Sequence, residues 1–136
     1  MSPETLNQFD DSLSRCHTNP RFLDLFYEKF LSSSEEVREK FKNTDFRTQK
    51  RALRASFYLI MLAAEDEENG PEKYLKDLAI VHDAEHLDVG AGLYDLWLDS
   101  LLATVAECDP EHNDNVAQIW EEVAMVGVSY LCSNYR

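Results

Sequence analysis

The segment LAIVHDAEHLDVGAGLYDLWL, residues 78–98, contains two helical patterns and the histidine on which the interpretation of the whole chain depends. His82 follows Leu78 by four residues and Leu75 by seven. This spacing predicts that its ring leaves the helix on the same face as the leucines and points into the core. A second histidine, His86, comes one turn later, where the sequence DVG indicates that the helix is ending.

This segment alone leaves three interpretations of His82 open. It could be a core histidine that is satisfied by a backbone carbonyl or by water. It could share a metal ion with His86, although the H-E-x-x-H pattern of helical zinc pairs is absent. It could also be the single axial ligand of a larger cofactor. The other two histidines, His17 and His112, fall in expected turns, where we expect solvated side chains.

The rest of the chain is typical of an all-α protein. Glycine and proline number four each, most of them lie at expected helix ends, and strand-like alternation is absent. Helix-start signals and apolar spacing predict about seven helices in one domain covering 1–136. They begin at Ser2–Pro3, at Asn19–Pro20, at Ser33 with Glu36 in capping-box spacing, at Asp45 for a long helix to about Asp66, at Pro71, at Leu93 for a helix to about Cys108, and after DPEHNDN at residues 109–115.

Composition excludes several classes of partner. The 136 residues include 26 Asp and Glu against 13 Lys and Arg, a formal net charge of −13. Such a surface repels nucleic acid and anionic membranes. The longest apolar run, residues 56–64, is less than half of the roughly 20 residues that span a bilayer, and no basic-plus-apolar leader is present. Three cysteines without C-x-x-C spacing fit a reducing compartment, so we expect a soluble, cytoplasmic protein.

Three polar side chains on three expected helices are predicted to point inward. Tyr27 shares a helical face with Leu23, and Gln49 heads the apolar face that continues through Leu53. A buried phenol or amide is costly unless it meets a polar partner. Each alone is typical of a polar residue at the edge of the core with a satisfied partner, but three such residues on three helices, with His82 as the third, are less ordinary.

Six residues spread along the chain form an ordered set, although each alone would be a weak signal. The set is Tyr27 in FYEKFLSSSEEVREKF, Phe41 fourteen residues later, Gln49 and Leu53 in QKRAL, His82, and Tyr94 at the start of YDLWLDSLL. In this order the set resembles the globin family, especially the single-domain bacterial haemoglobins and the haem domain of flavohaemoglobins. The resemblance covers essentially the whole chain and implies a globin fold, with about seven helices around a haem pocket.

The resemblance also implies a role for each residue of the set toward haem b, iron protoporphyrin IX. His82 would be the proximal axial ligand of the iron, and Tyr94 would form a hydrogen bond near it. Tyr27 and Gln49 would line the distal side, and Leu53 would form an apolar wall there. Phe41 would stack on the porphyrin. The corner after Phe41 is shorter than in flavohaemoglobins, so Thr48 or Lys50 could replace Gln49 at the distal position. The proximal glutamate that flavohaemoglobins carry late in the last helix has no clear counterpart, which argues against a peroxidase-like proximal side.

Three functions remain open at this stage. The resemblance implies reversible binding of oxygen and of other diatomic gases, nitric oxide and carbon monoxide. A phenol and an amide on the distal side would stabilise bound oxygen, which carries partial negative charge. A nitric oxide dioxygenase is an alternative, but no flavin or nicotinamide domain fits in this chain, so that enzyme would need a separate reductase. A haem-free globin-fold module that binds only protein partners is the third.

Overall fold

A computed structural model describes residues 1–83 and 88–135, and these residues form seven α-helices and no strand. The helices are α1 (Pro3–His17), α2 (Phe22–Ser33), α3 (Glu35–Lys40), α4 (Phe46–Glu65), α5 (Gly70–His82), α6 (Ala91–Cys108) and α7 (Asp114–Ser133). The all-α prediction is therefore confirmed. None of these helices is long and apolar enough to cross a membrane.

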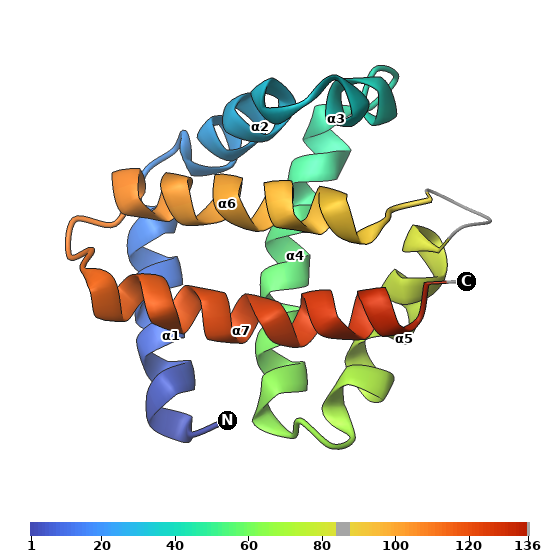
Figure 1. Cartoon of the computed structure of the whole chain (residues 1–136). Helices are drawn as coiled ribbons and strands as arrows, with labels where there is room; N and C mark the ends of the chain where they lie inside the picture. Colours follow the sequence, from blue (N-terminus) through green and yellow to red (C-terminus); the bar gives the residue numbers. More distant parts are fainter. Residues whose placement is uncertain (84–87, 136) are drawn as a thin grey trace.

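The helices are arranged in two crossing layers (Figure 1). Helices α6 and α7 run in opposite directions side by side, and α1 and α4 cross behind them. Helix α7 packs against α1, α4, α5 and α6, and α2 packs against α6. The chain thus buries every long helix against at least two others.

The two helices α2 and α3 begin one or two residues later than the sequence predicted. The Asn19 side chain accepts a hydrogen bond from the backbone N–H of Arg21 (2.9 Å), which makes a turn and delays α2 by two residues. The hydroxyl of Ser34, rather than that of Ser33, accepts from the backbone N–H of Val37 (3.1 Å) and caps α3. Both corrections concern short polar side chains that can serve equally well as a cap or as part of a turn.

The centre of the core is the Trp120 side chain, which is fully buried. Three phenylalanines from three other helices surround its indole: Phe9 of α1 at 4.6 Å between ring centroids, Phe57 of α4 at 5.8 Å and Phe22 of α2 at 6.4 Å. Aromatic pairs in such tilted or edge-on geometry add to the energy of burial. One side chain of α7 thereby fixes the positions of α1, α2 and α4.

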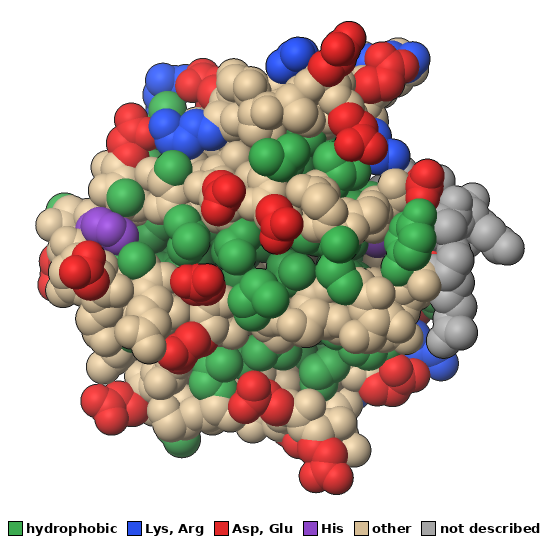
Figure 2. Space-filling model, viewed as in Figure 1, with side chains coloured by type: hydrophobic (Ala, Val, Ile, Leu, Met, Phe, Trp, Pro, Cys, Tyr) green, Lys and Arg blue, Asp and Glu red, His purple; other side chains and the backbone are tan. Residues whose placement is uncertain are grey.

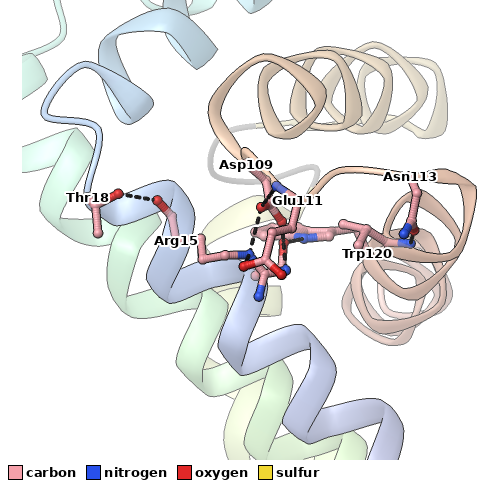
Figure 3. Close-up of polar contacts among 8 residues, drawn as sticks. Arg15, Thr18, Asp109, Glu111, Asn113 and Trp120 are labelled. Carbon is pink, nitrogen blue, oxygen red and sulfur yellow. Dashed lines mark hydrogen bonds and ion pairs between the residues drawn. The ribbon is translucent and has the colours of Figure 1, made fainter.

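A buried carboxylate links α1 to the turn between α6 and α7 (Figure 3). The Asp109 side chain has no exposed area, and it accepts hydrogen bonds from Arg15 Nε (2.7 Å), Ser12 Oγ (2.6 Å) and the backbone N–H of Glu111 (2.8 Å). Trp120 Nε1 in turn donates to Ser12 Oγ (2.8 Å). The network therefore joins the ion pair to the central indole.

The same hydrogen bonds determine the charge state of Asp109. Burial alone would raise the pKa of this carboxyl, but the bonds from Arg15, Ser12 and the Glu111 backbone outweigh burial and lower the pKa to about 2. The carboxylate therefore stays ionised at any ordinary pH. Its stabilising contribution is complete above the pKa of the unfolded chain, about 3.9, and disappears as the pH falls toward about 2.

A close backbone contact joins the end of α4 to the start of α5. A Cβ atom added at Gly70 would lie 2.9 Å from the Cα of Ala63, which real Cβ atoms essentially never do. Ala63 has no exposed area, and the Gly70 N–H donates to the carbonyl of Asp66 (2.6 Å) in the turn between the helices. From this contact the two helices separate toward the other end of α5 (Figure 1). Only glycine permits this approach.

We predict that Asp109→Asn lowers the free energy of unfolding by about 2–3 kcal/mol at neutral pH, because the bonds to a charged acceptor are lost. Urea unfolding followed by circular dichroism measures this. The deficit should shrink as the pH falls from about 4 toward 2, where the native carboxylate is itself protonated. The exposed Asp77 of α5 provides the matched control, since Asp77→Asn should cost little at either pH. A pH-independent deficit would contradict the assigned role.

We also predict that Gly70→Ala destabilises the protein by about 1–3 kcal/mol or more, because the new methyl group meets backbone that cannot move aside. Gly92→Ala is the control, because a Cβ added at that helical position meets nothing within 4 Å outside its chain neighbours and the backbone of its own helix. This second variant should be neutral or stabilising by up to about 1 kcal/mol. Thermal unfolding of the two variants and of the parent protein measures these changes in stability. Equal stability of the Gly70→Ala and Gly92→Ala variants would refute the close contact.

Candidate functional site

The six residues that the sequence singled out fall into two groups in the structure. The first group lies where α2, α3 and α4 meet and consists of Tyr27, Phe41, Gln49 and Leu53. The second lies where the end of α5 meets α6 and consists of His82 and Tyr94. Within the described part of the chain, no hydrogen bond or ring contact joins one group to the other. His86, the other histidine of the segment at residues 78–98, lies outside the described residues.

Tyr27 and Gln49 are in direct contact. The Tyr27 side chain points inward from α2 with only 5% of the residue exposed, and Gln49 Nε2 of α4 donates to its hydroxyl oxygen (3.1 Å). Because that oxygen accepts the amide hydrogen, the hydroxyl hydrogen remains available for another acceptor. Burial raises the pKa of Tyr27 to about 12, against the opposite effect of Gln49. At neutral pH the phenol is therefore protonated and can donate.

The neighbours of Gln49 face elsewhere. The Thr48 hydroxyl donates to the carboxylate of Asp45 (3.1 Å) at the start of α4, and its side chain is exposed. Lys50 Nζ forms an ion pair with Asp24 (2.6 Å) across to α2. Of the three residues considered for the distal position, only Gln49 is hydrogen-bonded to the phenol.

Aromatic rings and a leucine surround this polar pair. Phe41, the residue that follows α3, stacks against Phe46 with ring centroids 6.1 Å apart and planes 29° apart. Both rings meet Tyr27 edge-on, at 5.9 and 5.3 Å. Leu53 is buried one turn after Gln49. Phe46 was not among the predicted residues, but its position three residues before Gln49 on the same helix face was a signal that could have found it.

His82 ends α5 and is held by its own helix. Its Nδ1 lies 2.8 Å from the carbonyl oxygen of Leu78. A carbonyl only accepts, so Nδ1 carries the hydrogen and donates, and the lone pair of the neutral ring is on Nε2. Burial lowers the pKa of His82, although the Leu78 carbonyl has the opposite effect. The ring is thus neutral near pH 7 and has the form of a nitrogen ligand.

Tyr94 of α6 lies against the His82 ring, with centroids 6.5 Å apart and planes 30° apart. Burial, and then the neighbouring Cys132 thiol, raise the pKa of this phenol. Tyr94 belongs to a small apolar cluster with Ala79 and Val128, which connects α5, α6 and α7. The ring of His82 is therefore supported from one side as well as bonded to its helix.

The other two histidines differ from the sequence expectation. His17 and His112 were expected to be solvated, but both are half-buried, and each has one ring nitrogen that is buried without a hydrogen-bond partner among the described residues. His17 is the last residue of α1 rather than part of a turn. Its neighbours on other helices, which the sequence does not specify, account for the burial.

The donor set fits haem better than a metal ion held by several side chains. Among the described residues, no group of three or more His, Cys, Asp or Glu could hold a metal. The structure instead offers one neutral imidazole with a free Nε2, and separately a phenol donor within aromatic and aliphatic side chains. A flat cofactor that needs one axial nitrogen and apolar surroundings matches these residues.

No model of a known protein family matches this sequence, and no curated protein matches it. The structure is similar to the crystal structure of a protein from Pseudomonas aeruginosa PAO1, which is described as structurally highly homologous to a human hemoglobin. The two chains share 34% sequence identity, and the match covers 96% of this chain and 98% of the other, with a TM-score of 0.91. The likeness thus extends over nearly the whole of both chains.

Proposed function

The chain belongs to the globin family, and we propose that it binds haem b and, through it, binds oxygen and other diatomic gases reversibly. The observation that carries this proposal is the hydrogen bond from His82 Nδ1 to the Leu78 carbonyl. It fixes the tautomer in which Nε2 is an electron-pair donor, and such bonds are typical of histidines that ligate metals. When bound, the haem iron supplies an open coordination position for a diatomic gas.

On the proximal side, His82 would hold the cofactor through Nε2, and Tyr94 would limit rotation of the imidazole ring by lying along it. The orientation of a ligating ring depends on such outer contacts as much as on the ligand itself. On the other side, Phe41 and Leu53 offer apolar surface against the cofactor. These residues would exclude water from the space in which a gas ligand would bind.

On the distal side, Tyr27 would donate its free hydroxyl hydrogen to a ligand that carries partial negative charge. One hydrogen bond to a charged acceptor is worth about 1.5–3 kcal/mol, which corresponds to roughly ten- to a hundredfold in ligand lifetime. Gln49 would act through Tyr27, because its amide already donates to the phenol oxygen and so directs the hydroxyl hydrogen away from α4. The pair therefore forms a two-step chain of donors in a water-poor site.

We predict that the purified protein takes up haem with a Soret band, and that His82→Ala abolishes this binding or its axial ligation, while His86→Ala leaves it intact. Absorption spectra of the ferric, ferrous and ferrous carbon monoxide forms measure uptake and coordination together. Added imidazole should restore the spectrum of the His82→Ala protein, which separates loss of the ligand from loss of the fold.

Absence of haem uptake by the parent protein would leave a haem-free module as the explanation. A parent-like spectrum in His82→Ala, or a lost spectrum in His86→Ala, would instead show that haem binds with a different axial ligand.

We further predict that Tyr27→Phe increases the oxygen dissociation rate about ten- to a hundredfold, because the donor to the ligand is removed. Gln49→Leu should increase it less, about two- to tenfold, since only a neutral bond to the phenol is lost. Tyr58→Phe is the control, because Tyr58 is exposed on α4. Stopped-flow displacement of oxygen by carbon monoxide measures the rates. An unchanged rate in Tyr27→Phe would remove this residue from the mechanism.

A further inference from the structure

The outer face of α4 carries three arginines in a row. Arg47, Arg51 and Arg54 follow one another by four and three residues, so they share one face of the helix. Gln49 precedes Arg51 by two residues, which places it about 200° around the helix. The arginines therefore lie opposite the side that meets Tyr27, and they are not part of the proposed haem site.

These arginines line a cavity of about 430 Å³ between α4 and the segment that joins α1 to α2. Lys50, Asp24 and His17 also line it. Lys50 and Asp24 form an ion pair (2.6 Å) and cancel each other's charge. The remaining charged side chains in the wall are the three arginines, so the cavity is strongly positive.

This concentration of positive charge contrasts with the acidic character of the molecule as a whole. Acidic residues outnumber basic ones by 26 to 13, and acidic side chains are scattered over the face formed by α6 and α7 (Figure 2). Within the described residues, no carboxylate forms an ion pair with Arg47, Arg51 or Arg54. Like charges four residues apart on a helix destabilise it. A bound anion would remove this repulsion.

His17 also lines the cavity, and its ring lies edge-on against Phe22 (5.3 Å). Its Nε2 is buried and has no hydrogen-bond partner among the described residues. Buried polar groups in native structures are nearly always satisfied, so an unpaired ring nitrogen calls for an explanation. Burial, and then the nearby Arg54, lower the pKa of His17, and the neutral ring can donate to an oxygen.

The beginning of α2 opens on the same cavity. This twelve-residue helix has no side-chain cap, and Leu23 and Asp24 of its first turn line the wall. The N–H of Phe22 already donates to the carbonyl of Asn19 (3.1 Å), but the helix dipole still favours negative charge at this end. The guanidinium groups, the imidazole and the helix start all favour a ligand with several anionic oxygens.

We propose that this cavity binds a small anion with two or more phosphate groups, held chiefly by Arg47, Arg51 and Arg54. Each guanidinium presents a planar fork of N–H donors that matches phosphate, and three of them balance the charge of a diphosphate. The net charge of −13 opposes long polyanions, because such a ligand extends past the arginines and comes within about 10 Å of acidic side chains, where repulsion is not screened. A compact anion meets only the positive wall.

The test is calorimetric titration of the purified protein with inorganic pyrophosphate near neutral pH, at a constant ionic strength of about 0.1 M. We expect saturable binding with one site per chain. The double variant Arg51→Gln, Arg54→Gln should weaken the affinity about tenfold or more. Both residues are exposed, so the fold should survive, and circular dichroism verifies this. His17→Gln should weaken binding less.

The matched control removes the same amount of charge elsewhere. Arg38→Gln with Lys42→Gln, both exposed at α3 and the turn after it, should leave the affinity within about twofold of the parent. Equal loss in the control would show that only the total charge matters, and would overturn the proposal. So would absence of binding up to about 10 mM pyrophosphate. Citrate binding as tight as pyrophosphate would refute the preference for phosphate.

Discussion

The backbone contact between Ala63 and Gly70 sets the geometry of the candidate haem site. Because α4 and α5 touch at this point and separate from it, they form two arms of a wedge. Gln49 lies fourteen residues from Ala63 along one arm, and His82 lies twelve residues from Gly70 along the other. At 1.5 Å per residue these positions are about 21 and 18 Å from the contact. The proposed distal and proximal residues are thus carried to comparable distances on opposite arms.

The features that the sequence predicted well are those that repeat with the helical period. The inward direction of Tyr27 and Gln49 followed from apolar neighbours four residues away, and the structure places both side chains in contact. The start of α1 was equally predictable, since Ser2 accepts from the Thr5 backbone as the residue pattern indicated. Local spacing suffices where one helix face meets a core.

The features that the sequence did not predict depend on partners far along the chain. The turn containing Asp109 is acidic and polar in sequence, yet its carboxylate is buried by Ser12 and Arg15, 97 and 94 residues away. His17 differs from the expectation because its ring meets Phe22 of α2 and lines the same cavity as Arg54 of α4, and the sequence pattern shows neither neighbour. No local pattern distinguishes a carboxylate that will be paired from one that will be solvated.

Two neighbouring contacts between α2 and α4 have a consequence for the phenol. Asp24 and Tyr27, one turn apart on α2, bind Lys50 and Gln49, which are adjacent on α4. A rotation or slide of one helix against the other would break at least one of these two cross-links. The fold itself therefore fixes the position of the Tyr27 hydroxyl oxygen. For the proposed gas ligand, preorganisation of this kind would leave little conformational entropy to be lost on binding.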